Sequence, residues 1–213
     1  MEPYQKTFIE LAIKHQALKF GEFTLKSGRK SPYFFNMGQL HTGLALKTLG
    51  ECYANAIQKS KFDYEVLFGP AYKGIPLVCT TTVAMMALYN QDLPYAFNRK
   101  EIKAHGEGGN IVGAALNTKV LIIDDVITAG TAIRESLELI KLSGGQVTGI
   151  MVALDRQEKG QGSQSALQEI EHTQQVPVKS IINFSNILSF IENDPRLANV
   201  AGSMKLYREQ YGV

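Results

Sequence analysis

Short apolar runs rich in β-branched residues recur along this chain and alternate with helical patterns. After residue 60 there are five such runs: Val66–Phe68, Leu93–Phe97, Val120–Ile123, Val147–Leu154 and Val176–Ile182. Residues 74–89 and 131–142, which lie between runs, have the length and apolar spacing of helices. Continuous apolar strands that alternate with helices are typical of a parallel sheet covered on both faces, so the pattern predicts an α/β fold.

The two ends of the chain have a different pattern. A helical pattern over about residues 8–18 precedes two strand-like stretches, 22–26 and 31–36, which flank a turn signal and indicate a hairpin. Residues 185–213 are helical in pattern and carry spaced apolar side chains. We expect this tail to pack against the hairpin.

The charge balance disfavours some classes of function. The 213 residues carry a formal net charge of +2, which is too small to attract nucleic acid or an anionic membrane over the whole surface. The first residues have no apolar run like that of a signal peptide, and no stretch has membrane length. Cys52 and Cys79 match no zinc or redox spacing, so we expect reduced thiols. These features predict a cytoplasmic protein.

Two adjacent carboxylates, Asp124 and Asp125, follow the third apolar run. In a parallel sheet, ligands bind beyond the carboxyl ends of the strands, where this pair would lie. Small and hydroxylated residues from Thr128 to Thr131 come next and precede a helix, whose first N–H groups favour an anion. Carboxylates repel a phosphate unless the ligand also offers hydroxyls or a metal ion. A sugar phosphate meets both conditions, and an ordinary helix cap is the alternative explanation of the same residues.

Other strand ends carry further polar residues. The loop after the first run contains Tyr72 and Lys73 and is a second candidate anion site; it is not a Walker A motif, because Ile75 stands at the lysine position. The segment 98–110 is rich in glycine and basic residues and is predicted to be a mobile lid. Arg156 follows the fourth run, where it either binds a ligand or pairs with a neighbouring carboxylate.

These residues resemble those of the type I phosphoribosyltransferases, and of the bacterial orotate phosphoribosyltransferases in particular. The stretch from Val120 to Ala132 is similar to the motif with which the family binds phosphoribosyl pyrophosphate (PRPP). Further segments carry the resemblance over essentially the whole chain: residues 22–36, 68–76, 97–109 and 154–158.

The resemblance implies the type I phosphoribosyltransferase fold, an α/β fold in which helices flank a parallel sheet. It implies one domain over residues 1–213, with a core at about 41–184. A small hood, formed by the N-terminal hairpin and the terminal helices, would occupy roughly residues 1–40 and 185–213.

The resemblance also implies the residues of two neighbouring sites. Those implied to bind PRPP are Lys26, Tyr72, Lys73, Arg99, Lys100, Lys103, His105, Asp124, Asp125, Val126, Ile127, Thr128, Ala129, Gly130, Thr131 and Ala132. Those implied to bind orotate are Lys26, Phe34, Phe35, Thr128 and Arg156. The implied catalytic residues are Lys103, His105, Asp124 and Asp125, and His105 is either an acid or a phosphate donor.

The implied reaction transfers the ribose 5-phosphate group from PRPP to orotate, giving orotidine 5′-monophosphate and pyrophosphate in pyrimidine biosynthesis. Mg²⁺ is the implied cofactor, bound mainly through PRPP near Asp124 and Asp125 rather than by the protein alone. The family resemblance implies a homodimer in which the 98–110 segment reaches the neighbouring active site, with no nucleic acid or membrane partner. Two alternatives stay open: a phosphoribosyltransferase for another base, and a PRPP-sensing regulator of nucleotide metabolism.

Overall fold

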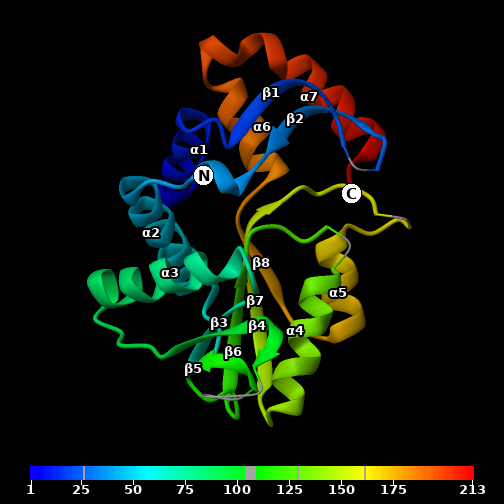
Figure 1. The fold of residues 1–213 in the computed structure, drawn as a ribbon. Coiled ribbons are helices and arrows are strands. Elements are labelled where there is room, and N and C mark those ends of the chain that lie inside the picture. Colours follow the sequence, from blue (N-terminus) through cyan, green and yellow to red (C-terminus); the bar gives the residue numbers. More distant parts are fainter. Residues whose placement is uncertain (26, 104–108, 129, 161) are drawn as a thin grey trace.

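One six-stranded sheet forms the centre of the described structure. The structure, a computed structural model, describes residues 1–213 apart from Lys26, residues 104–108, Ala129 and Gln161, and leaves the side chains of 102–109 undescribed (Figure 1). The strands are β3 Val66–Gly69, β4 Tyr95–Lys103, β5 Gly109–Gly113, β6 Lys119–Asp124, β7 Gln146–Asp155 and β8 Val178–Asn183. Their order is β5-β4-β3-β6-β7-β8, and all neighbours are parallel except β4 and β5.

Helices cover both faces of this sheet. On one side lie α1 Pro3–Lys14, α2 Gly43–Ser60 and α3 Gly74–Tyr89, and on the other lie α4 Thr131–Leu142 and α5 Ala166–Gln174 (Figure 1). Side chains along β6 alternate between two apolar clusters, because successive residues of a strand point to opposite faces. Leu121 and Ile123 pack into the first cluster, whereas Val120 and Ile122 pack into the second. This double burial explains the continuous apolar runs, and it confirms the predicted α/β fold.

The hairpin and the tail pack together at the end of the sheet where β6 and β7 finish. Strands β1 Leu18–Thr24 and β2 Lys30–Phe35 are antiparallel, with the short helix η1 Met37–Gln39 after them. The tail consists of α6 Phe184–Glu192, η2 Pro195–Leu197 and α7 Ala198–Tyr211. The ring of Tyr33 lies 5.7 Å from that of Phe184 and 6.4 Å from that of Tyr207, measured between centroids. The expected packing of the tail against the hairpin is therefore confirmed.

Two predictions about local structure were wrong. The first helix ends at Lys14 rather than near residue 18, since Gln16 has a positive φ of 58° and Leu18 already pairs with Phe35 in the hairpin. The segment 98–110 was expected to be a loop, yet residues 98–103 continue β4. The antiparallel edge strand β5, which pairs with β4, was not predicted, because its glycines hide the apolar alternation of a strand.

Among the described residues, no helix is both long and apolar enough to cross a membrane.

Candidate active site

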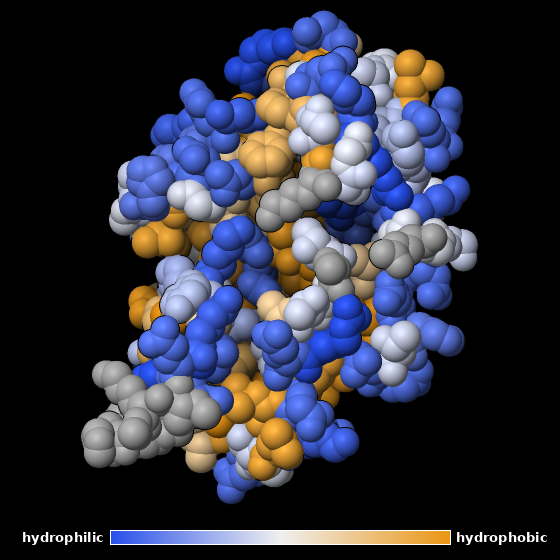
Figure 2. All heavy atoms as spheres, turned by 45° about the vertical axis from the view of Figure 1, so that its right-hand side comes forward, coloured by the Kyte–Doolittle hydropathy of each residue, from blue (hydrophilic) through white to orange (hydrophobic). Residues whose placement is uncertain are grey.

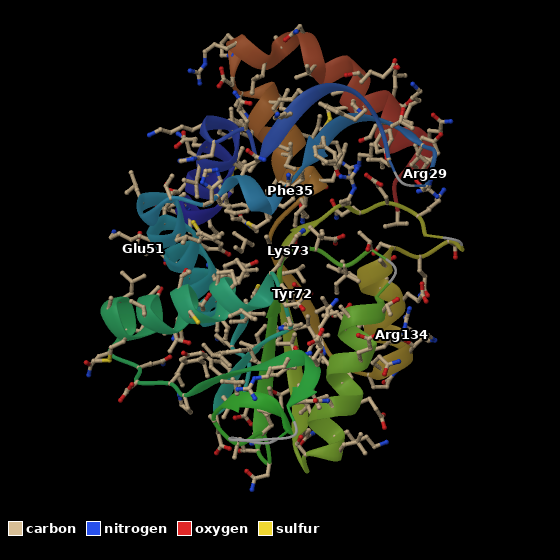
Figure 3. All side chains as sticks on the ribbon, in the orientation of Figure 1. Arg29, Phe35, Glu51, Tyr72, Lys73 and Arg134 are labelled. Atoms are coloured by element: carbon tan, nitrogen blue, oxygen red, sulfur yellow. The ribbon has the colours of Figure 1, made fainter. Side chains whose placement is uncertain are left out.

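The candidate site lies where the sheet meets the hairpin. Figure 2 shows a hollow in the surface between the hairpin and tail above and the sheet with its helices below. In Figure 3, Tyr72 and Lys73 lie at the end of the sheet that faces the hairpin, where Phe35 is also found. Asp124 ends β6 and Asp125 follows it, and Asp125 pairs with Lys73, so these polar strand ends converge as the carboxyl-end rule predicts.

The backbone of the acidic pair is held from two sides. The hydroxyl of Tyr53, on α2, donates to the carbonyl oxygen of Asp124 at 2.8 Å, and the N–H of Ala153, on β7, donates to the carbonyl of Asp125 at 2.8 Å. Burial raises the pKa of Tyr53 well above its ordinary value, so this hydroxyl remains a donor. Nothing in the local sequence around residue 124 indicates these partners, which come from distant segments.

The two carboxylates are buried and differ in their surroundings. Asp124 is 8% exposed and accepts the N–H of Asp125 at 2.9 Å. Asp125 is 6% exposed, accepts the N–H of Val126 at 2.8 Å and pairs with Nζ of Lys73 at 2.5 Å. Burial, and next the charge of Asp125, raise the pKa of Asp124 to about 7, while the Asp125 N–H and Lys73 act against the rise. One carboxyl group of the pair therefore titrates near neutral pH.

The loop that carries Tyr72 and Lys73 depends on two close backbone contacts. A Cβ atom at Gly69 would lie 2.1 Å from the carbonyl oxygen of Gly74, and one at Gly74 would lie 2.7 Å from the carbonyl carbon of Gly69. Neither position has room for a side chain, so the start of α3 turns back onto the end of β3. This turn brings Lys73, the residue before α3, to Asp125.

Strand β4 also contacts the loop that carries Tyr72 and Lys73. The side-chain oxygen of Asn98 accepts the N–H of Ala71 at 2.8 Å, and Nζ of Lys100 lies 5.3 Å from the centre of the Tyr72 ring. Lys100 is exposed and Arg99 is half-buried. The structure thus brings together Tyr72, Lys73, Lys100 and the acidic pair, and it adds Asn98, which the sequence did not single out.

The segment between β6 and α4 carries the first of the two candidate anion sites, the one expected beside the acidic pair. Val126 and Ile127 are partly or fully buried against the two apolar clusters, whereas Thr128, Thr131 and Ala132 are exposed. Gly130 precedes α4 with a positive φ of 70°, and among the described residues no side-chain cap is found at this helix end. The first N–H groups of α4 are therefore available to an anion, which agrees with the expectation from the sequence.

The residues expected near orotate lie on the hairpin and at the end of β7. Phe34 is 39% exposed and contacts Phe23, with 5.6 Å between centroids, whereas Phe35 packs toward Phe8 at 6.2 Å. Adjacent strand residues thus face opposite ways, as predicted. Arg156 forms an ion pair with Glu158 at 2.7 Å, which is the pairing considered as the alternative to ligand binding.

Some expected site residues lie outside the described part of the chain. Lys26, His105 and Ala129 are not described, and Lys103 is described only through its backbone, which pairs with Gly109 between β4 and β5. Their expected roles stay predictions.

Comparisons with known proteins agree with this geometry. A family model for the phosphoribosyl transferase domain matches residues 37–180. The chain is 54% identical to an orotate phosphoribosyltransferase of Klebsiella pneumoniae (strain 342) over 213 residues, all of both sequences. A crystal structure of orotate phosphoribosyltransferase from Francisella tularensis is 47% identical, with a TM-score of 0.87 over 97% of this chain and 99% of that chain. A Mycobacterium tuberculosis H37Rv orotate phosphoribosyltransferase in complex with PRPP shares the fold, with 20% identity and a TM-score of 0.63 over 86% of this chain and 98% of that chain.

Proposed function

We propose, because this chain belongs to the phosphoribosyltransferase family and to its orotate phosphoribosyltransferases, that the site at the strand ends binds PRPP beside orotate. The chain is a pentosyltransferase of pyrimidine biosynthesis, which moves the ribose 5-phosphate group of PRPP to orotate. One observation carries the assignment of the site: a buried carboxylate pair lies between a lysine and the uncapped start of a helix.

The three parts of that arrangement match the three parts of PRPP. The 5′-phosphate would bind the first N–H groups of α4 together with residues 126–132. The ribose hydroxyls would donate to Asp124 and Asp125, whose carboxylates are acceptors. The pyrophosphate would lie against Tyr72 and Lys73, and its charge would attract the basic residues of the 98–110 segment.

Charge development explains why the reaction suits these residues. As pyrophosphate leaves C1 of the ribose, positive charge develops on the sugar ring and negative charge on the leaving group. Buried carboxylates near the ring stabilise the first, and Lys73, with Arg99, Lys100, Lys103 and His105 from the 98–110 segment, stabilises the second. Orotate, held by Lys26, Phe34, Phe35, Thr128 and Arg156, then forms the new bond through its nitrogen.

The acidic pair also suits a Mg²⁺ ion that is bound mainly through the substrate and water, with few ligands from the protein. Mg²⁺ prefers six oxygen ligands and keeps several waters or substrate oxygens among them. Two buried carboxylates, one of them paired with Lys73, offer only part of such a shell. We therefore propose that Asp124 and Asp125 hold Mg²⁺ through PRPP, and the ion would neutralise charge on the pyrophosphate.

An orotate assay tests the proposed function. Purified protein is mixed with PRPP, Mg²⁺ and orotate, and the ultraviolet absorbance of orotate is followed. We expect orotate to be consumed as pyrophosphate is released, with activity lost in excess EDTA and restored by added Mg²⁺. Adenine, hypoxanthine and uracil serve as control bases. Consumption of one of these bases in place of orotate would contradict the base assignment, and full activity in EDTA would contradict the Mg²⁺ proposal.

We also propose that the protein is a homodimer in which the 98–110 segment reaches the neighbouring site. Support comes from α3, which is apolar on all sides although it lies at the surface. One face packs into the core through residues such as Val78 and Met85, while Val83 is 69% exposed and Met86 is 47% exposed. A helix that is apolar all round is normally buried, so a partner surface is expected over its outer face.

Val83→Glu is expected to weaken the dimer, because it places a charge in that apolar face. Sedimentation velocity over a range of protein concentrations measures the change. Leu142→Glu is the matched control, since Leu142 is 77% exposed at the end of α4 on the other side of the sheet. A wild-type protein that sediments as a monomer, or equal dissociation of both variants, would contradict this interface.

A further inference from the structure

The guanidinium of Arg156 is held on several sides by the protein. Its Nε donates to Oε1 of Glu158 at 2.9 Å, and its Nη2 lies 2.7 Å from the same oxygen. Nη2 also donates to the hydroxyl of Ser31 at 3.2 Å. The side chains of Arg156 and Glu158 are 20% and 12% exposed, so the pair is largely removed from water. A long, flexible side chain is thereby confined to one place.

The hairpin completes this arrangement. The ring of Tyr33, on β2, lies 4.2 Å from Cζ of Arg156, and its hydroxyl donates to Oε1 of Glu158 at 3.2 Å. Tyr33 is fully buried and packs edge-on against Phe184 and Tyr207. One carboxylate therefore ties the arginine to an aromatic ring whose own position is fixed by packing.

The backbone around Glu158 is fixed as well. The backbone of Glu158 forms an isolated antiparallel β-bridge with that of Gly212 at the end of the tail. The N–H of Lys159 donates to the carbonyl of Tyr211 at 2.8 Å. Arg29, in the hairpin turn, donates to the carbonyl of Lys159 at 2.6 Å. The segment after β7 is thus joined to both the hairpin and the tail.

A buried ion pair contributes little net stability, because the loss of hydration offsets the attraction. Here the ion pair fixes the orientation of the Arg156 guanidinium. The pair uses Nε and Nη2 and leaves the Nη1 amino group outside it. A planar donor group in a fixed orientation suits a planar anion, since a guanidinium donates to a carboxylate along defined directions.

We propose that Glu158, acting with Tyr33, is a positioning residue that holds the Arg156 guanidinium for the carboxylate of orotate. This inference rests on the proposed function, which assigns Arg156 to orotate. Glu158 does not touch the substrate in this scheme. It determines where the arginine lies before orotate binds, so its effect is on recognition of the base and not on binding of PRPP.

Steady-state kinetics of Glu158→Gln and Glu158→Ala test the inference. We expect KM for orotate to rise about tenfold in Glu158→Ala, since a small misplacement of a binding group has large kinetic effects. Glu158→Gln keeps one acceptor oxygen and should recover part of the loss. KM for PRPP should stay within about twofold of wild type in both variants, because the PRPP residues are untouched.

Two controls separate positioning from a structural role. Asp194→Asn breaks a pair with the same two-residue spacing, Asp194 with Arg196 in the tail at 2.6 Å, and should leave both KM values unchanged. In an Arg156→Met background, Glu158→Gln should cause no further rise in KM for orotate, because Glu158 acts through Arg156.

Failure of the positioning role of Glu158 and failure of the proposed function give different results in these experiments. If wild-type protein consumes no orotate, the function fails, whatever the variants do. If wild type is active and Glu158→Ala raises both KM values equally, or lowers Tm without changing KM for orotate, the positioning role is overturned. A further rise in the Arg156→Met background overturns it as well.

Discussion

Replacing Asp125 by asparagine is expected to lower kcat/KM for PRPP by about 10²–10³-fold, the range seen when an oriented group that stabilises a transition state is removed. Asp125 accepts the N–H of Val126 and pairs with Lys73. Asparagine keeps the first contact but turns an NH₂ group toward the lysine, and it loses the charge near the ribose. Initial rates at varied PRPP, with orotate saturating, measure the effect.

The fold should tolerate this change. Lys73 is 58% exposed, so its ammonium is hydrated when the partner is lost, and a buried charge disappears with Asp125. We expect Tm to be unchanged or higher. Asp63→Asn, which removes the exposed partner of Lys119, is the control and should keep wild-type activity. Activity of Asp125→Asn within about threefold of wild type would remove this carboxylate from the reaction.

A second variant tells whether Lys73 and Asp125 act as a unit. If the lysine is oriented by the carboxylate before PRPP binds, Lys73→Met and Asp125→Asn should not be additive. The double variant should then lose less activity than the product of the two single losses, because either change alone already breaks the pair. Strict multiplication of the losses would show that the two residues act separately.

The sequence predicted the elements that carry strong local signals. The predicted ranges 74–89 and 131–142 coincide with α3 and α4. Both ends are marked: Asn90 ends α3 in the left-handed conformation, and Gly144 follows α4 with a φ of 81°. Those signals depend on neighbouring residues only, which is why they can be read without the fold.

The parts that the sequence did not predict depend on distant residues. Strand β5 is short, lies at the edge and contains Gly109 and Gly113, so it has little apolar alternation of its own and forms by pairing with β4. In the same way, Tyr53 reaches Asp124 across 71 positions in sequence, and Ser31 reaches Arg156 across 125. Such contacts arise only when helices and the hairpin pack on the finished sheet.

The candidate site falls between these two cases. Its members could be gathered from the sequence because parallel strands place their carboxyl ends at one edge of the sheet. The pairing of Lys73 with Asp125 follows from that rule once both strand ends are identified. The state of the carboxylates does not follow from it, since the pKa of Asp124 depends on burial and on the charge of its neighbour.

Asp124→Asn is expected to raise the stability of the substrate-free protein relative to wild type at pH 8. At pH 5 this advantage of the variant over wild type should be smaller. The pKa of Asp124 is about 7 in the folded protein, against about 3.9 for an unfolded aspartate. A raised folded pKa means that the group's contribution to stability is complete below pH 4. This contribution decreases as pH rises above the unfolded pKa, and it is fully lost once pH has risen through the folded pKa of about 7. Between pH 5 and pH 8 the loss in wild type is roughly 2–3 kcal/mol, which asparagine does not undergo.

Thermal melts at the two pH values measure this difference. For a chain of this size, roughly 2–3 kcal/mol corresponds to a relative Tm shift of roughly 5–10 °C between wild type and variant. Asparagine can still accept the N–H of Asp125, so the local geometry is kept. Burial also raises the pKa of Asp155, which changes stability with pH in the same direction, but that contribution is common to both proteins and cancels in the comparison.

The same titration links stability to binding. If the ribose hydroxyls and Mg²⁺ bind the ionised form of Asp124, PRPP can bind only after that carboxyl group loses its proton. At pH 6.5 a group with a pKa of about 7 is roughly three-quarters protonated. Binding at that pH should therefore release roughly 0.7–0.8 proton more in wild type than in Asp124→Asn. Titration calorimetry in two buffers of different ionisation enthalpy measures the number released. Equal proton release by both proteins would show that Asp124 is already ionised before PRPP binds, and the pH-dependent stability difference would then have to be absent as well.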